Sequence, residues 1–264
     1  MAGFSAKDVQ ALRHATGAGM MDAKKALVTC DGDSAAAAKW LREKGLGKAA
    51  ERTDRDNTQG AVAIGTSGSA AAIVELKCET DFVAKSDRFV AVAQRLADAV
   101  AAGGEAATDE HRHAVDDLKV TLKENIAVGR MSRIEAGEGS VLDRYLHRQD
   151  GRGVNAVLVE LAGGSAELAH DIAVHIAFAR PVFLRREEVP AAEVASERST
   201  LEQITRAEGK PEAAMDKIVQ GRLAAWYKTR VLLEQDFVRD EKQAVGAVLG
   251  DAAVVRFAQI VVGG

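Results

Sequence analysis

The side chains best suited to act on another molecule in this sequence are an adjacent acid and aromatic, Asp81 and Phe82. Before them, residues 74–78 alternate apolar and charged side chains with the period of two expected of a half-buried strand. After them, apolar residues recur at helical spacing between positions 89 and 100. We therefore expect Asp81 and Phe82 at a corner between a strand and a helix, pointing away from the core. The alternative is that Phe82 closes the top of the core and Asp81 caps a turn.

No pattern for nucleotide binding or covalent catalysis accompanies this pair. A phosphate-binding loop needs the spacing GxxxxGK[ST], whereas residues 45–48 read GLGK, with no hydroxyl residue after the lysine. Cys30 and Cys78 have no histidine close by in the sequence, so catalytic thiol chemistry lacks support. We expect no direct nucleotide binding, and an activity that is not enzymatic in the sense of breaking a covalent bond.

The histidines lack metal-binding spacing. His111 and His113 are two positions apart, and His170 and His175 are five apart. Neither pair has the i,i+4 spacing that places two ligands on one helix face. Two cysteines are also too few for a structural zinc site. We expect no metal and no cofactor.

Composition narrows the class of protein. A net charge of −4 and a pI of about 5.9 argue against a protein that coats nucleic acid, so we expect no nucleic-acid partner. No apolar run approaches the length of a membrane span, and no signal-peptide pattern is present, so we expect no membrane association. With 2 cysteines in 264 residues, we expect reduced thiols and a cytoplasmic protein.

The N-terminal third divides into a helical module and a linker. Ser5 and Asp8 have capping-box spacing before an apolar stripe at helical period, and glycines near position 18 and at position 32 break the helices. Residues 1–45 therefore predict three short helices, a pattern that resembles a ubiquitin-associated module, with the third helix ending near Gly45. Residues 46–60 are polar and charged without a sustained apolar period, which predicts a linker, with helix as an alternative for its first half.

The remaining chain predicts an α+β core with two similar halves, residues 61–140 and 141–264. In each half a strand ending in an apolar-Glu-Leu run precedes an apolar-striped helix, which indicates an internal duplication. Within the second half, residues 191–228 are strongly helical and are interrupted by Gly209-Lys210-Pro211. We expect a protruding antiparallel helical hairpin there, and a closing strand at residues 254–257.

Two long motifs resemble bacterial elongation factor Ts. Residues 16–27 read TGAGMMDAKKAL and residues 80–85 read TDFVAK, in the order and spacing of that family. Further matches are Glu124-Asn125-Ile126, Tyr145 with His147, and His175-Ile176-Ala177. The resemblance covers essentially the whole chain and is weakest between about residues 185 and 235. It implies a guanine-nucleotide exchange factor that binds elongation factor Tu in GDP-bound and nucleotide-free forms, with two related α+β core subdomains.

The resemblance also assigns candidate contacts with elongation factor Tu. It implies that Asp81 and Phe82, with Thr80 and Val83 beside them, enter the partner near its magnesium and phosphate site. The other implied contacts are Arg13, Met20, Met21 and Lys24 in the N-terminal module, and His147, Phe237 and Val238 in the second half. The residues after His147 depart from the family pattern.

Helix geometry predicts the exposure of the methionines without reference to the family. Adjacent helical residues lie about 100° apart, so Met20 and Met21 cannot both point into a small core, and at least one is expected at the surface. The alternative is a partly buried pair. For the chain as a whole, the competing function is a ubiquitin-associated-type adaptor that binds a peptide or the ribosome without exchange activity.

Overall fold

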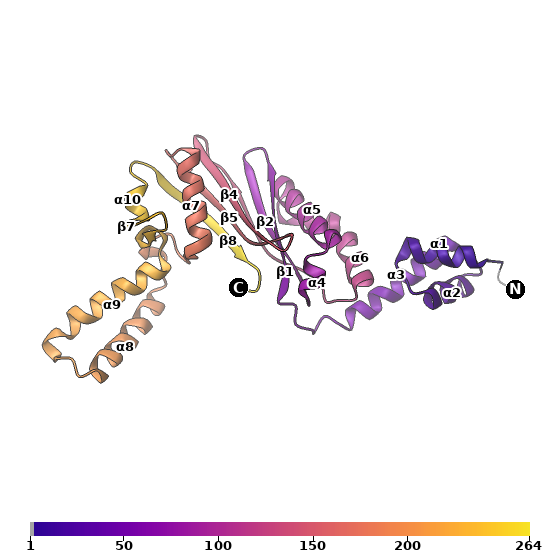
Figure 1. Cartoon of the computed structure of the whole chain (residues 1–264), viewed down its shortest axis with the longest axis horizontal. Helices are drawn as coiled ribbons and strands as arrows, with labels where there is room; N and C mark the ends of the chain where they lie inside the picture. The colour runs from indigo at the N-terminus through magenta and orange to yellow at the C-terminus, as the bar shows by residue number, and fades with distance from the viewer. Residues whose placement is uncertain (1–2) are drawn as a thin grey trace.

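The computed structural model of the chain describes residues 3–264. Three helices lie at one end of a long molecule, two three-stranded sheets lie in the middle, and a pair of helices projects at the other end (Figure 1). Neighbouring strands within the sheets are antiparallel throughout. Helices are therefore packed on antiparallel sheets, which confirms the predicted α+β class.

The N-terminal helices follow their local sequence signals. Their bounds are α1 (Ala6–Thr16), α2 (Met20–Thr29) and α3 (Ser34–Ala50). The backbone N–H of Ser5 donates to the Asp8 carboxylate (2.7 Å) and the Ser5 hydroxyl accepts from the Asp8 N–H (3.4 Å), which completes the predicted capping box. Gly17 ends α1 with a φ of +68°, a left-handed conformation that glycine adopts without strain. These helices enclose a small core of Val9, Leu12, Ala23, Ala26, Leu27, Ala37 and Leu41.

The third helix runs further than its glycines predict. It continues through Gly45 and Gly47 to Ala50, so the segment without helix or strand before the first sheet is residues 51–58. A Cβ on Gly45 would lie 2.6 Å from Cγ1 of Val120, which belongs to α6 (Arg112–Leu122). Gly45 therefore serves the close packing of α3 against α6 rather than the end of α3.

The first sheet unit places helices beside three antiparallel strands. Its order is β1-β2-β3, and the helix α5 packs on β1 and β2. The bounds are β1 (Gln59–Ser67), β2 (Ala70–Cys78), α4 (Asp81–Ala84), α5 (Asp87–Gly103), η1 (Glu105–His111), α6 and β3 (Ala127–Glu135). The strand β2 and the helix α5 confirm the strand predicted at residues 74–78 and the helix predicted between positions 89 and 100. Phe89, Leu96 and Leu118 are among the fully buried side chains of this unit.

The second sheet unit repeats this layout. Its order is β4-β5-β8, with the middle strand followed by the helix α7 that packs on the sheet. The bounds are β4 (Ser140–Gln149), β5 (Arg152–Ala162), α7 (Ala166–Ala179) and β8 (Ala253–Val261). Ser165 caps α7 by accepting from the N–H of Leu168 (3.1 Å). The predicted closing strand near residues 254–257 is β8.

Each sheet contains a matching ion pair whose arginine also reaches the other sheet. On the middle strand of each sheet lies a buried glutamate, Glu75 on β2 and Glu160 on β5. Arg130 Nε lies 2.9 Å from the Glu75 carboxylate, and Arg256 Nε lies 2.7 Å from that of Glu160. Each arginine also donates to a backbone carbonyl of the other unit's edge strand, at 2.6 Å. The equivalent positions agree with the predicted duplication.

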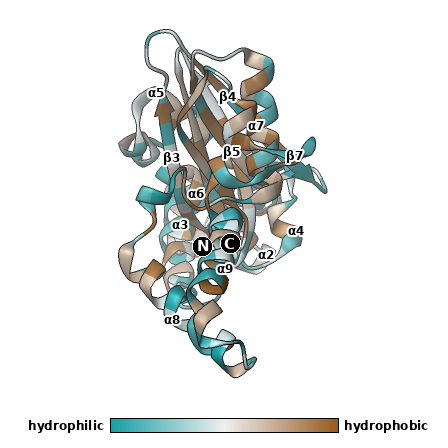
Figure 2. Cartoon of the chain, turned by 90° about the vertical axis from the view of Figure 1, so that its left-hand side faces the viewer, coloured by the Kyte–Doolittle hydropathy of each residue, from teal (hydrophilic) through white to brown (hydrophobic). Residues whose placement is uncertain are grey.

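A helical hairpin projects beyond the second unit (Figure 1). Its helices are α8 (Ala191–Ala207) and α9 (Met215–Arg230), joined through Gly209 and the short η3 (Glu212–Ala214). A small cluster at its base contains Val189, Leu223, Tyr227 and Val231. Apolar residues are concentrated in the sheets, whereas α8 and α9 contain both hydrophobic and hydrophilic residues (Figure 2). The hairpin therefore has a narrow core of its own, as its sequence predicts.

Short elements complete the second unit around the base of the hairpin. They are η2 (Arg186–Glu188), η4 (Leu232–Glu234), β6 (Asp236–Phe237), β7 (Asp240–Ala244) and α10 (Val245–Val248). Throughout residues 3–264, no helix combines the length and the apolar character needed to cross a membrane.

Candidate partner-binding site

Asp81 and Phe82 lie at the corner that their sequence predicts. β2 ends at Cys78, and Thr80 begins the one-turn helix α4 by accepting from the Val83 N–H (3.4 Å). The Phe82 side chain is 75% exposed. The alternative in which Phe82 closes the core is therefore wrong, and Thr80 rather than Asp81 is the cap. Val83 faces inward and packs against the first core.

A glutamate from a distant segment fixes this corner. The Glu124 carboxylate accepts from the backbone N–H groups of Glu79 (3.0 Å) and Thr80 (3.1 Å), and from the Thr80 hydroxyl (2.5 Å). The neighbouring Asn125 N–H donates to the Glu79 carboxylate (2.6 Å), and its side chain donates to two carbonyl groups of residues 51–58. Hydrogen bonds to a carboxylate are stronger than those between neutral groups. The exposed pair is therefore presented on an ordered backbone.

Sequence reasoning gave Glu124 no role. Glu124 and Asn125 enter the sequence analysis only through the resemblance to the family. The signal that could have located them is a polar pair immediately before a buried residue, Ile126, which directly precedes β3.

Lys85 contacts both members of the exposed pair. Its ammonium lies 3.2 Å from the Asp81 carboxylate and 4.5 Å from the centre of the Phe82 ring. The Asp81 side chain is 52% exposed and that of Lys85 is 37% exposed, so water screens this ion pair. An incoming partner can therefore replace Lys85 at little cost in free energy.

A second exposed patch lies on the N-terminal module. Met20 is 47% and Met21 is 75% exposed on α2, so the alternative of a partly buried pair is wrong. Lys24 on α2 and Arg13 on α1 are exposed as well. Flexible, exposed methionines are suited to protein contacts. In Figures 1 and 2, α2 and α4 lie toward the same side of the long molecule, so both patches can meet one partner.

The remaining candidates lie in the second unit. His147 is exposed near the end of β4, beside a hollow that Tyr145 and Phe178 also line. Phe178 is 76% exposed. This apolar and aromatic surface was not predicted, because Phe178 is one of the apolar residues of α7, and apolar residues at helical spacing predict a core position.

Phe237 requires a correction. Its side chain is 5% exposed and packs in the second core, with its ring centre 5.8 Å from that of His175. The ring fills space beneath α7 and offers no surface to a partner, so the expected direct contact by the Phe237 side chain is contradicted. Val238 is half-buried, and its contact with the partner stays a prediction.

His175 holds the segment around Phe237 in place through two hydrogen bonds. Its Nδ1 accepts from the Val238 N–H (3.2 Å), so its proton lies on Nε2, which donates to Oε1 of Gln235 (3.0 Å). The ring is fully buried, and burial lowers its pKa below the usual value, although the bond to Gln235 opposes the shift. His175 therefore joins α7 to β6 as a neutral imidazole.

The described residues offer little for metal or thiol chemistry. Within residues 3–264 no three His, Cys, Asp or Glu side chains gather where they could hold an ion. Burial raises the pKa of the Cys78 thiol to about 12, which disfavours the reactive thiolate. The geometry supports contact with a macromolecule through exposed side chains.

Comparisons with known proteins place the chain in a family. The sequence model of the family described as elongation factor TS matches residues 79–264, beginning at the corner that carries Asp81 and Phe82. The chain is 45% identical over 277 residues to elongation factor Ts of Clavibacter michiganensis subsp. michiganensis, with all of both chains covered. This chain belongs to the elongation factor Ts family. It is also 43% identical to the Kineococcus radiotolerans member, with 96% of each chain covered, and 42% identical to the Micrococcus luteus member over the full length of both.

Membership of the elongation factor Ts family makes the protein a translation elongation factor. The family model starts after the three N-terminal helices, but the full-length relatives align with that part as well. The N-terminal helical module therefore aligns with the full-length relatives. Both exposed patches lie in the aligned part of the chain.

Proposed function

We propose that this protein is the guanine-nucleotide exchange factor of elongation factor Tu. It binds the GDP-bound factor, promotes GDP release and remains bound to the nucleotide-free form. Because coupling between two ligands is reciprocal, a protein that binds the empty form more tightly weakens GDP binding by the same free energy. No covalent bond is broken and no cofactor is required, so the protein is not an enzyme. We place this activity in the cytoplasm.

The observation that carries the proposal is the exposed Phe82 on its anchored corner. Burial of an aromatic side chain between elements of a partner supplies binding free energy at a small contact. Asp81 beside it brings a negative charge toward the magnesium ion that helps to hold the GDP phosphates. We propose that Phe82 opens the site while Asp81 disturbs the magnesium shell.

The N-terminal module supplies the second contact in this proposal. Met20 and Met21 contact an apolar surface of the GTP-binding domain of elongation factor Tu, and Arg13 and Lys24 add charges around it. His147 and Val238 are proposed as further contacts from the second sheet unit. Contacts at both ends of the core would fix the direction in which Asp81 and Phe82 enter the partner.

Release of fluorescent GDP from elongation factor Tu tests the proposal. Micromolar protein is expected to accelerate release, and excess GDP is expected to dissociate the complex of the two proteins. The adaptor alternative predicts binding to a peptide or to the ribosome with an unchanged GDP off-rate. An unchanged off-rate would therefore reject exchange activity and favour the adaptor.

A further inference from the structure

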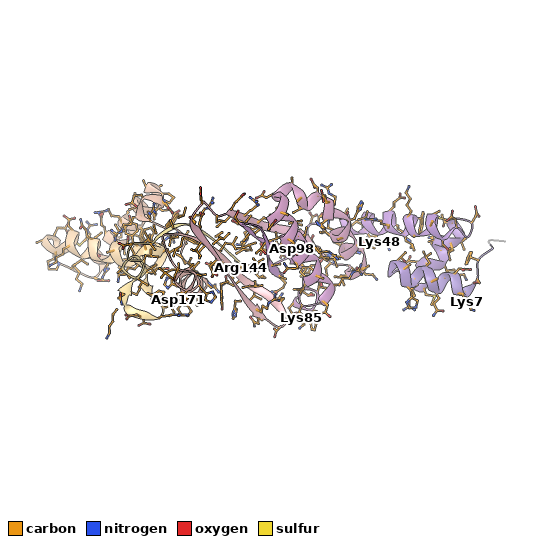
Figure 3. The ribbon with its side chains drawn as sticks, turned by 90° about the horizontal axis from the view of Figure 1, so that it is seen from above. Lys7, Lys48, Lys85, Asp98, Arg144 and Asp171 are labelled. Atoms are coloured by element: carbon orange, nitrogen blue, oxygen red, sulfur yellow. The ribbon has the colours of Figure 1, made fainter. Side chains whose placement is uncertain are left out.

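A basic cleft lies where the N-terminal module meets the core. It has a volume of about 180 Å³ and is enclosed by the α1–α2 turn, the second half of α3 with the turn after it, and the end of α6. Lys48, at this junction, is labelled in Figure 3. The charged residues that line the cleft are Asp22, Lys44, Lys48, Arg52 and Lys123. Four positive groups and one negative group leave a local charge of +3 on a chain whose net charge is −4.

Most of this positive charge is not neutralised by the protein. Lys44 Nζ lies 3.3 Å from a carboxylate oxygen of Asp22. In the part of the chain that the structure describes, Lys48, Arg52 and Lys123 form no ion pair. Nη1 of Arg52 is buried and has no hydrogen-bond partner, whereas most buried donors have an acceptor. Because Arg52 lines the cleft, an anion bound there would supply an acceptor for its guanidinium.

The second feature of the cleft is the backbone conformation of Lys123. This residue ends α6 with a φ of +60°, a left-handed conformation in which any side chain is strained relative to glycine. A cation near a helix C-terminus is favourable, but Lys119 already supplies one in the last turn of α6. Neither the backbone nor the helix end therefore requires a lysine at this position, and its side chain lines the basic cleft.

We propose that this cleft binds a small phosphate-bearing anion through Lys48, Arg52 and Lys123. Lysine and arginine form strong, charge-assisted hydrogen bonds with phosphate oxygens. Pockets that enclose a whole organic ligand occupy roughly 300–1,000 Å³. A cleft of about 180 Å³ is therefore suited to a phosphate or diphosphate group without an enclosed nucleoside. Because Lys48 and Arg52 belong to the module side and Lys123 to the core side, the bound anion joins the two parts.

Titration of the full-length protein with sodium diphosphate tests this site. Calorimetry at low ionic strength is expected to show saturable binding that weakens with added salt, and diphosphate is expected to raise the Tm. Removal of one charged hydrogen bond by Lys48→Gln should weaken binding by about tenfold or more. The matched control is Lys217→Gln on α9, an exposed lysine far along the chain from the cleft, which should leave binding unchanged.

Lys123→Gly separates the binding role from the folding role. It relieves the left-handed strain, so the Tm without diphosphate should rise, while the further rise caused by diphosphate should be lost. Arg180→Gly is the matched control, because Arg180 is a basic residue that ends α7 with a φ of +48°. That variant should gain the same intrinsic stability and keep the full response to diphosphate.

Competing ligands identify the chemistry that is recognised. Equal affinities for diphosphate, ADP and GDP would support recognition of the phosphate groups alone. A strong preference for GDP over diphosphate would overturn it, as would the absence of saturable binding. Equal losses of affinity in the Lys48→Gln and Lys217→Gln proteins would also overturn the proposed location. None of these measurements requires elongation factor Tu, so the site and the exchange activity are tested separately.

Discussion

At the scale of single residues, the corner proposed to drive exchange combines an exposed ring with a fixed cap. The Phe82 ring is 75% exposed, while the Thr80 hydroxyl beneath it is bonded to Glu124. The side chain proposed to contact the partner thus contributes little to the fold, whereas Glu124 fixes the position of the corner through its hydrogen bonds. Function and stability can therefore be separated by mutation at this corner.

Phe82→Ala should weaken the complex with elongation factor Tu by roughly 1–3 kcal/mol, as expected for an aromatic anchor at an interface. The Tm of the isolated protein should stay unchanged, because the ring is exposed. Asp81→Ala should slow GDP release with a smaller loss of binding. Calorimetry and stopped-flow GDP release check both variants, with Ile204→Ala on α8 as an exposed apolar control. Unfolding of the isolated Phe82→Ala protein would show that the ring belongs to the core.

His175 should make folding stability depend on pH. Its folded pKa is lowered by burial, so below the unfolded value of about 6.5 the unfolded chain binds a proton that the folded chain does not. The free energy of unfolding should therefore fall as pH decreases from about 6.5, by at most about 1.4 kcal/mol per pH unit from this group. Urea unfolding of wild type, His175→Gln and the exposed control His14→Gln measures the effect. The slope should disappear only in His175→Gln.

At the scale of elements, the corner between β2 and α4 is held by the segment before β3. Glu124 gathers three donors from residues 79 and 80, so the position of α4 depends on a carboxylate rather than on its own single turn. A helix this short has almost no stability by itself. The hairpin of α8 and α9 differs, because its helices pack on each other and carry none of the residues proposed to open the nucleotide site.

Glu124→Gln should loosen the corner without removing Phe82. The amide keeps one acceptor oxygen but turns its NH₂ group toward a donor, which should cost about 1–3 kcal/mol of local stability. Amide hydrogen exchange at Thr80 and Val83 should accelerate, and GDP release should slow. The exposed Glu138→Gln is the matched control. Unchanged exchange at both amides would show that Glu124 does not order the corner.

At the scale of the whole molecule, the exposed patches are spread along a long body. Two sheet units are joined by paired arginines, and the helical module packs on α6 through Gly45 and Val120. This arrangement sets the separation between the methionines of α2 and Phe82. A partner that contacts both patches must match that separation, so module and core are expected to act together.

Removal of residues 1–50 should leave a folded core with sharply reduced exchange activity. The module has its own apolar core, whereas Arg13, Met20, Met21 and Lys24 are lost with it. Because the cut exposes Val120, Val120→Ser in the truncated chain should prevent association without restoring exchange. Thermal unfolding and GDP release decide the outcome. Full activity of the truncated protein would remove the module from the mechanism.

The sequence by itself determined the elements and the corner, and the tertiary structure decided what is exposed there. Capping residues, apolar periods and turn residues act within a few positions, so they predicted the helices, the strand that ends at Cys78 and the corner at Asp81. Burial depends on contacts between distant segments. That is why Phe237 is in the core, why Gly45 lies within a helix, and why Glu124, 44 positions from Thr80, fixes the cap.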